Sequence, residues 1–319
     1  KIDRLLFRKT ARLKKDPLIL NWILLFLPWI LLLPLKKLGN VLVFKKIQGK
    51  LGNNFLGGVS GGGALPPAVD EFFWAVGINI VEGYGLTETA PVISVRPFNA
   101  PVFGTVGKPI AGVEVRIVGE DGSVLPAGEK GVVHVRGGIV MKGYYKKAEL
   151  TAKAIDSEGW FNTGDLGMLT IDGEIVLRGR IKDTIVLRGG ENVEPLPLEM
   201  KLNESRYISQ SVILGQDEKF LVALLVPEKE EVLSYAKENN IDGESFEVLI
   251  EKDEIKKMFE SEIHGLVSGK NGFKPFERIV RFALLPAPFE IGIHLSAKQE
   301  IMRYKMPELY AKELKELFK

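Results

Sequence analysis

One segment, residues 55–81, restricts the possible folds of this chain more than any other. A β-rich run at 55–59 is followed by a glycine-rich turn at 60–67, a helical pattern at 68–76 and an apolar run at 78–81. Strand, turn, helix and strand in this order predict a parallel β-α-β unit, and therefore an α/β fold. A glycine-rich turn before a helix lets a ligand approach the backbone, although such a turn can equally serve tight packing.

The next residues, 82–89, read Glu-Gly-Tyr-Gly-Leu-Thr-Glu-Thr. Two glycines after an apolar run predict a tight turn at which the backbone comes close to a ligand. Tyr84 offers a flat surface for a base, Thr87 offers a hydroxyl, and Glu88 offers a carboxylate for the Mg²⁺ that accompanies phosphates. These residue types favour a nucleotide site. The alternative is a glycine turn with an N-capping threonine.

Two further stretches combine turns with charged residues. The sequence Gly-Trp-Phe-Asn-Thr-Gly-Asp at 159–165 places Asp165 on a predicted tight turn at the end of a strand. An ionised carboxylate has two acceptor oxygens and suits the two hydroxyls of a ribose, while an ordinary β-turn aspartate is the alternative. Residues 177–195 predict two β-rich runs around a charged connection, which by themselves indicate a solvated hairpin.

Taken in order, these stretches resemble the signatures of the AMP-forming, adenylate-forming enzymes, in particular the long-chain fatty acyl-CoA synthetases. The resemblance extends over nearly the whole chain, but over only the second half or so of a usual family member. It implies the end of a large α/β domain at 1–181, with a β-α-β portion at 55–97 and a β-rich subdomain at 98–181. A small mobile α+β domain is implied at 182–319.

The resemblance also implies a role for each matching residue. Thr87 would contact an α-phosphate oxygen, Glu88 would hold Mg²⁺, and Lys182 would be the hinge between the two domains. The residues implied in binding adenine, ribose, phosphate or the acceptor thiol are Gly61, Gly62, Gly63, Ala64, Gly83, Tyr84, Gly85, Asp165, Arg180, Gly189 and Gly190. The implied reaction is activation of a fatty acid by ATP to acyl-AMP, followed by transfer to the thiol of coenzyme A.

Two parts of the family's machinery differ in this sequence. We find no Ser/Thr/Gly-rich loop with a lysine to wrap the ATP triphosphate, so we expect the chain alone to adenylate poorly. Glu300 also occupies the position of the catalytic lysine in the stretch Leu-Ser-Ala-Lys-Gln-Glu-Ile-Met-Arg at 295–303. Lys298, two positions earlier, is our candidate for neutralising charge on the forming adenylate. The alternative is a solvated loop lysine.

The first fifty residues indicate contact with a membrane surface. They hold twelve Lys or Arg and two acids, and the run 18–35 has a single polar member, Asn21. Basic residues beside apolar ones suit an anionic membrane or an acidic ligand. Pro28 and Pro34 interrupt the run, so we predict a bent apolar hairpin that packs on the core or enters a membrane interface, rather than a span. No cleavage site follows, which argues against a signal peptide.

Composition narrows the class of protein further. With 45% hydrophobic and 26% charged residues this is a folded globular chain, and its net charge of +2 does not indicate a nucleic-acid partner. It has no cysteine, which excludes disulfides, thiolate metal sites and a cysteine nucleophile. We expect a cytoplasmic protein that can lie peripherally on the inner face of a membrane. Its first residue is Lys1, which indicates a processed or partial product.

Other functions stay open at this point. The acceptor can be the pantetheine arm of an acyl carrier protein instead of coenzyme A, and the acid can be an aryl acid instead of a fatty acid. The chain can also be an adenylate-binding remnant without turnover, which the missing phosphate loop supports. A membrane-associated interaction protein that kept the fold and lost the chemistry is a further alternative, supported by Glu300.

Overall fold

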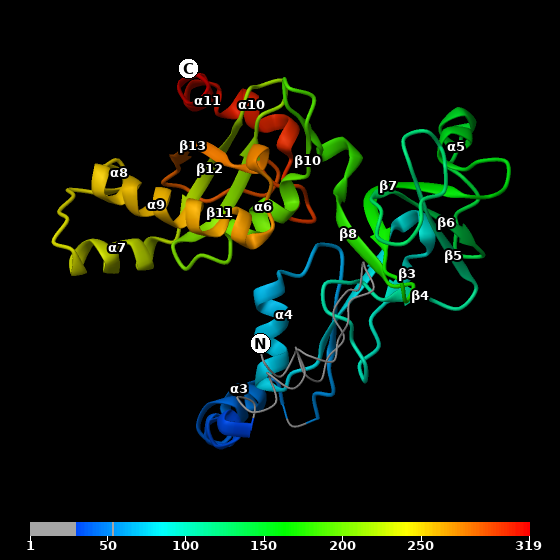
Figure 1. Ribbon diagram of the computed structural model, residues 1–319, viewed down its shortest axis with the longest axis horizontal. Coiled ribbons are helices and arrows are strands. Elements are labelled where there is room, and N and C mark those ends of the chain that lie inside the picture. Colours follow the sequence, from blue (N-terminus) through cyan, green and yellow to red (C-terminus); the bar gives the residue numbers. More distant parts are fainter. Residues whose placement is uncertain (1–29, 53) are drawn as a thin grey trace. The chain divides into compact units, whose positions relative to one another are not determined.

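The computed structural model describes residues 30–52 and 54–319 (Figure 1). Backbone contacts divide the chain into two compact units between Arg178 and Gly179. Both units combine helices with β-sheets, which confirms the predicted α/β class. The basic segment at 1–17 and most of the apolar run 18–35 lie outside the described residues.

The predicted β-α-β unit is present in the first unit. β1 (Gly58–Ser60) and β2 (Ile80–Gly85) pair in parallel, and α4 (Pro67–Val76) connects them. The helix begins on a proline, whose missing N–H would have no partner there, and Gly77 ends it in the left-handed conformation with a φ of +83°. The sheet has the order β1-β2-β3-β4, its other strands being β3 (Val92–Val95) and β4 (Lys108–Pro109).

The tight turn predicted at Gly83 and Gly85 is wrong. β2 continues through both glycines, and the chain turns later, at η2 (Thr87–Thr89). Gly85 has a packing role, because a Cβ at this position would lie 1.7 Å from the carbonyl oxygen of Pro91. The glycine therefore permits the close approach of two neighbouring chain segments, which the sequence pattern could not distinguish from the close approach of a ligand.

The β-rich runs that follow form a second sheet. Its strands, in order across the sheet, are β5 (Val113–Val118), β6 (Gly131–Gly137), β7 (Phe161–Leu169) and β8 (Ile175–Arg180). The pairs β5–β6 and β6–β7 are antiparallel, and α5 (Ala148–Ala154) lies in the connection between β6 and β7. One buried cluster joins both sheets of this unit, and its members are Tyr84, Ile93, Val106, Ile117, Val133, Val135 and Ile175.

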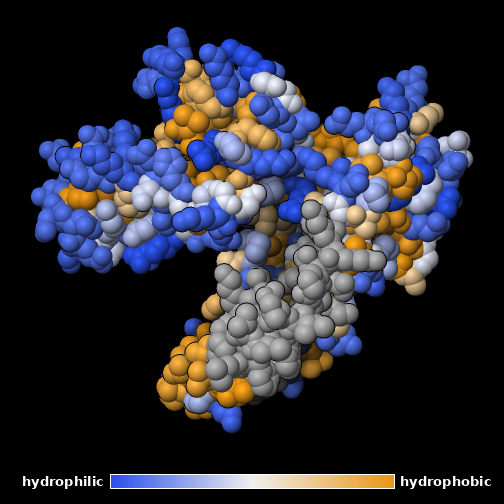
Figure 2. Space-filling view, in the orientation of Figure 1, coloured by the Kyte–Doolittle hydropathy of each residue, from blue (hydrophilic) through white to orange (hydrophobic). Residues whose placement is uncertain are grey.

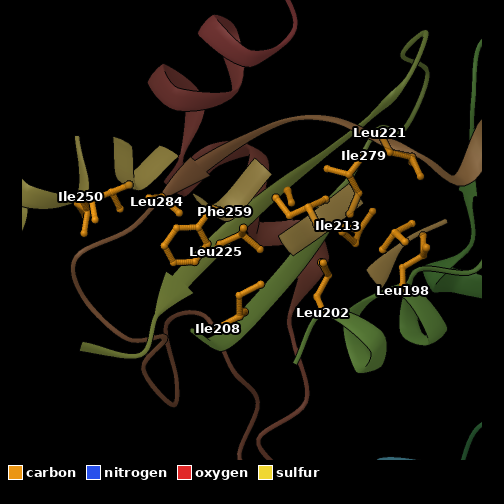
Figure 3. Close-up of a cluster of buried hydrophobic side chains, with 14 of the residues drawn as sticks. Leu198, Leu202, Ile208, Ile213, Leu221, Leu225, Ile250, Phe259, Ile279 and Leu284 are labelled. Atoms are coloured by element: carbon orange, nitrogen blue, oxygen red, sulfur yellow. The ribbon is translucent and has the colours of Figure 1, made fainter. Parts of the chain in front are cut away.

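The second unit is built on a sheet with the order β11-β12-β13. β11 (Ile208–Leu214) and β12 (Leu221–Pro227) are antiparallel, whereas β12 and β13 (Ile279–Leu284) are parallel. All of β12 is buried, and its alternate side chains enter two separate cores. The first core includes side chains of α6 (Pro195–Leu202) and α9 (Asp253–Leu266) (Figure 3). The second contains residues from the C-terminal segment.

The C-terminal helical segment is divided in two. Tyr310 leaves helical geometry, and its hydroxyl lies 3.0 Å from Nε2 of His294. The two helices are α10 (Met306–Leu309) and α11 (Ala311–Leu317). The remaining elements of this unit are η3 (Ile181–Asp183), β9 (Ile185–Val186), β10 (Asn192–Val193), α7 (Lys229–Glu238), α8 (Phe246–Ile250), η4 (Gly269–Asn271), η5 (Pro275–Glu277) and η6 (Arg303–Lys305).

A helical segment precedes β1. Residues 30–39 are helical and continue into the π-helix η1 (Asn40–Phe44) and α3 (Lys45–Lys50). None of residues 30–50 is buried. Across residues 30–52 and 54–319, no helix has both the length and the apolarity needed to cross a bilayer.

Candidate functional site

A buried hydrogen bond joins two of the sequence signatures. The hydroxyl of Tyr84, on β2, donates to Oδ2 of Asp165, on β7, over 2.6 Å. Tyr84 is 8% exposed and Asp165 is 5% exposed. The Tyr84 ring belongs to the core shared by the two sheets, so most of its surface packs against protein. The bond fixes the orientation of the Asp165 carboxylate relative to the end of β2.

The placement of Asp165 corrects the sequence prediction of a tight turn. Asp165 lies within β7, where a bulge sets residues 163–165 opposite Val133 of β6. Gly164 takes a φ of +71°, and the Thr163 hydroxyl donates to the Val133 carbonyl oxygen over 2.8 Å. A bulge re-aims the side chains of a strand. The bulge in β7 includes Asp165, whose carboxylate accepts the hydrogen bond from Tyr84.

The glycine-rich turn at 61–64 is exposed and open. A Cβ on Gly62 or Gly63 would meet no atom within 4 Å, and Gly62 has a φ of +85°. The turn is held at its far end, where the Leu65 N–H donates to Oε1 of Glu82 over 3.0 Å. Open space beside a fixed backbone suits the approach of a flat ligand. The adenine contact predicted for these residues stays a prediction.

A buried charge network supports this turn. Arg96 is 1% exposed, and its Nη1 lies 2.6 Å from Oδ2 of Asp70, on α4. Its Nη2 lies 4.0 Å from Oε2 of Glu82. Burial raises the pKa of Glu82, and the Leu65 N–H and the Arg96 charge oppose that rise. Because buried charges require partners, the network ties α4, β2 and the glycine-rich turn into one arrangement.

Thr87 and Glu88 lie together on η2. Thr87 is exposed and Glu88 is half-buried. Thr89 is fully buried, and its hydroxyl holds the turn by accepting from the Leu86 N–H and by donating to a backbone carbonyl. Tyr144 donates from its hydroxyl to Oε1 of Glu88 over 3.0 Å. This turn therefore presents a hydroxyl and a positioned carboxylate side by side.

The donor set fits Mg²⁺ that arrives with a nucleotide. Magnesium is usually held by one or two carboxylates while phosphates and water supply its other oxygens. Glu88 provides one such carboxylate, and the Tyr144 bond engages one of its two oxygens. Among the described residues, no group of three or more His, Asp or Glu side chains could hold a metal ion. The metal-binding role predicted for Glu88 stays a prediction.

The other predicted residues belong to the second unit. Arg180 ends β8, and Lys182 follows it, exposed, on η3. Gly189 and Gly190 form the tip of the hairpin between β9 and β10, where the Gly190 N–H donates to the Leu187 carbonyl oxygen over 2.8 Å. Gly190 has a φ of +89°. The roles predicted for these four residues stay predictions.

Lys298 lies on a tight loop of the second unit. Leu295 pairs with Ile301 across the loop, and the Ser296 hydroxyl accepts from the N–H groups of Lys298 and Glu300, each over 3.2 Å. Lys298 is exposed, while Glu300 is half-buried. The structure thus gives Lys298 a free side chain on a fixed backbone, and it gives Glu300 a more restricted one.

Comparison with known proteins identifies the family. The profile of the AMP-binding enzyme family matches residues 29–145, and that of the AMP-binding enzyme C-terminal domain matches residues 182–319. The chain belongs to the AMP-binding, adenylate-forming enzymes. The predicted resemblance is confirmed, and the second matched region begins close to the boundary between the two units.

Curated relatives of this family member include plant and bacterial ligases. Probable acyl-activating enzyme 16, chloroplastic, of Arabidopsis thaliana is 43% identical over 300 residues, covering 90% of this chain and 40% of the relative. The long-chain-fatty-acid–[acyl-carrier-protein] ligase AEE15 of the same plant is 46% identical over 228 residues, covering 66% of this chain and 31% of the relative. The long-chain-fatty-acid–CoA ligase FadD15 of Mycobacterium bovis is 34% identical over 280 residues, covering 87% of this chain and 44% of the relative. The chain spans less than half the length of each.

Solved structures confirm the fold. The A domain of carboxylic acid reductase from Segniliparus rugosus, in complex with AMP and a co-purified carboxylic acid, matches with a TM-score of 0.67 at 26% identity. That match covers 84% of this chain and 40% of the other. The adenylation domain of a carboxylate reductase from Mycobacterium chelonae matches 96% of this chain and 43% of its own, with a TM-score of 0.70 at 21% identity.

Three residues that support the candidate site were not predicted from the sequence: Asp70, Arg96 and Tyr144. Asp70 falls within an amphipathic helix and Arg96 directly follows an apolar strand. A charged residue in such a place is a usable signal, because a buried charge needs a partner. The partner itself was not readable, since Asp70 and Arg96 stand 26 positions apart in the chain. The contact of Tyr144 with Glu88 spans 56 positions, so it was not readable either.

Proposed function

We propose that this chain forms the adenylate-handling C-terminal part of an AMP-forming acid–thiol ligase that activates a long-chain fatty acid. The hydrogen bond between Tyr84 and Asp165 carries the proposal, because it brings two separate signatures to one place. Two of the relatives named above are long-chain fatty acid ligases. A solved relative was obtained with AMP and a carboxylic acid bound.

In the first half-reaction, a carboxylate oxygen of the fatty acid attacks the α-phosphorus of ATP. The bond to the β-phosphate breaks, pyrophosphate leaves, and acyl-AMP forms. Asp165, already oriented by Tyr84, would accept hydrogen bonds from the ribose hydroxyls. Thr87 would donate to an α-phosphate oxygen, and Arg180 would contact the ribose or phosphate. Mg²⁺, held by Glu88, supplies neutralisation of the phosphate charge when it is bound.

In the second half-reaction, a thiol attacks the acyl carbonyl carbon and AMP leaves. Lys182 would serve as the hinge for the movement between half-reactions, and Gly189 and Gly190 would lie beside the entering thiol. We propose coenzyme A as the acceptor, in line with the mycobacterial relative. A carrier-protein pantetheine is the second candidate, which the plant acyl-carrier-protein ligase favours. Comparing thioester yields with the two acceptors decides between them.

Fatty-acid-dependent release of pyrophosphate from Mg·ATP tests the function. The assay is run on the 319-residue chain and on the gene product with any residues upstream of Lys1 restored. We expect release from the longer form and little from the shorter one, because the triphosphate-wrapping loop is not among these residues. Omitting the fatty acid is the control. Release from neither form would contradict the proposed function and favour an adenylate-binding or scaffold protein.

We also propose that the helical segment at 30–50 contacts an anionic membrane surface. Its exposed apolar side chains, among them Leu31, Leu35, Val41 and Leu42, gather on its surface (Figure 2). The segment contains five lysines and no acid. Apolar contact combined with attraction of lysines to lipid phosphates gives peripheral binding. Residues 1–29, the rest of the predicted membrane segment, lie outside the described part.

Vesicle flotation tests this contact. We expect the chain to float with vesicles containing phosphatidylglycerol, and to float less with neutral phosphatidylcholine vesicles or at high salt, because salt screens the lysine charges. Replacing Lys36, Lys37 and Lys45 by glutamate should reduce flotation with the anionic vesicles. Replacing three lysines of the second unit, Lys252, Lys256 and Lys257, is the matched control. Equal flotation with both vesicle types would contradict the electrostatic part of the proposal.

A further inference from the structure

Two contacts tie Glu88 to the loop that follows β6. The Met141 N–H donates to the Glu88 carbonyl oxygen over 2.8 Å. The Tyr144 hydroxyl donates to Oε1 of the same residue over 3.0 Å. One loop thus fixes both the backbone and the carboxylate of Glu88. All three residues belong to the first unit.

Tyr144 is itself firmly placed. Its N–H donates to the Thr151 hydroxyl, on α5, over 2.9 Å, and its carbonyl oxygen accepts from the Lys147 N–H over 3.1 Å. Gly143 has a φ of +145°, and a Cβ there would lie 2.7 Å from Cγ2 of Thr151. Glycine is therefore needed for the loop to pass this close to α5. The phenol is presented to Glu88 by a constrained backbone.

In the contact between Tyr144 and Glu88, the Tyr144 hydroxyl is the hydrogen-bond donor. An ionised carboxylate has only acceptor oxygens, so the Tyr144 hydroxyl supplies the proton of this hydrogen bond. An ionised carboxylate that accepts a hydrogen bond on one oxygen can still offer its other oxygen to a cation. Outer partners of this kind orient metal-binding carboxylates.

We propose that Tyr144 is a positioning residue that holds the Glu88 carboxylate so that one oxygen faces the Mg²⁺ accompanying ATP. The proposal rests on the proposed function, since it requires Mg·ATP as the ligand. Tyr144 lies on the loop between β6 and α5, whereas Glu88 follows β2. The proposal therefore adds a second chain segment to the metal site. Its consequence is specific: loss of the hydroxyl should weaken the response to Mg²⁺ and leave the contacts to the nucleoside intact.

Tyr144→Phe tests the proposal, with Tyr145→Phe as the matched control. Tyr145 is the neighbouring tyrosine, and its side chain is 86% exposed. The protein used is the longest form of the gene product that releases pyrophosphate. Calorimetry without fatty acid gives the Kd of AMP, of ATP without metal and of ATP with Mg²⁺. The Mg²⁺ concentration for half-maximal pyrophosphate release and the kcat at saturating Mg²⁺ are measured in parallel.

We expect Tyr144→Phe to reduce the Mg²⁺-dependent gain in ATP affinity by roughly tenfold, and to raise the half-maximal Mg²⁺ concentration by a similar factor. The Kd of AMP and the kcat at saturating Mg²⁺ should stay close to those of the unchanged protein, and Tyr145→Phe should change nothing. A parallel loss of AMP affinity, or an unchanged Mg²⁺ response, overturns the role of Tyr144. Failure of the unchanged protein to bind AMP or Mg·ATP overturns the proposed function as well.

Discussion

Replacing Lys298 with methionine should lower the rate of adenylate formation by about 10²- to 10³-fold, the usual cost of removing one positioned group that neutralises transition-state charge. Negative charge builds on the carboxylate and the α-phosphate as they react, and an ammonium group stabilises it. Lys298 is exposed on a loop whose backbone is fixed by Ser296. Methionine keeps most of the length and the apolar character of the side chain and removes the ammonium group.

Glu300→Gln is the matched control for this prediction, because Glu300 lies on the same loop and its N–H donates to the same Ser296 hydroxyl. We expect its rate to stay within about threefold of the unchanged enzyme, since an interaction with a half-exposed charge is modest. The measurement is fatty-acid-dependent pyrophosphate release, with thiolysis of added acyl-AMP followed separately. Thiolysis should survive the Lys298 change. Full adenylation by Lys298→Met would show that this lysine is an ordinary solvated loop residue.

The sequence was most informative where hydrophobic period and family signature agreed. The parallel β-α-β unit predicted at 55–81 is present, because strand, glycine-rich turn, helix and strand in this order have few other solutions. α6 contains two prolines, Pro195 and Pro197, and proline usually interrupts a helix. The structure places both prolines in the first turn, where proline is tolerated.

The candidate site was less predictable, for a physical reason. Local sequence patterns identify Tyr84, Glu88 and Asp165 as residues suited to a nucleotide site. Contacts between segments distant in the sequence decide the position of each side chain. Asp165 was expected on a turn, because Gly164 beside it suggests one, whereas the glycine makes a bulge within β7. Gly85 was expected beside a ligand; the structure shows that it accommodates the Pro91 carbonyl oxygen, and its contact with a ligand stays a prediction. A glycine in the sequence indicates that something comes close to the backbone, but it does not distinguish a ligand from another segment of the chain.

A second large effect is expected at Arg303, which anchors the chain just after the Lys298 loop. Its guanidinium forms a two-pronged ion pair with Glu199, with Nη1 at 2.7 Å from Oε1 and Nη2 at 3.0 Å from Oε2. Nη1 also donates to the Ile213 carbonyl oxygen over 2.6 Å, and the Ile213 N–H donates to Oε1 of Glu199 over 2.8 Å. The Glu199 side chain is 5% exposed and that of Arg303 is 14% exposed.

Arg303→Met should therefore lower the unfolding free energy of the second unit by about 3–5 kcal/mol, because it leaves Glu199 as an uncompensated buried charge. Arg206→Met is the control: Arg206 pairs with Glu231 at 2.8 Å, but both side chains are largely exposed, so a loss of about 0–1 kcal/mol is expected. Hydrogen exchange of peptides from β11 and β12 reports on this unit separately from the first one.

The double variant Glu199→Gln/Arg303→Met separates charge from packing. Glutamine keeps an oxygen that can accept from the Ile213 N–H, and it removes the charge that Arg303 balances. If the cost of Arg303→Met is chiefly the unbalanced carboxylate, the double variant should recover most of the lost protection, since replacing both members of a buried pair is often nearly neutral. No recovery would mean that Arg303 acts mainly through its bond to the Ile213 carbonyl oxygen. In that case the β11 backbone, rather than the ion pair, would connect the Lys298 loop to the sheet.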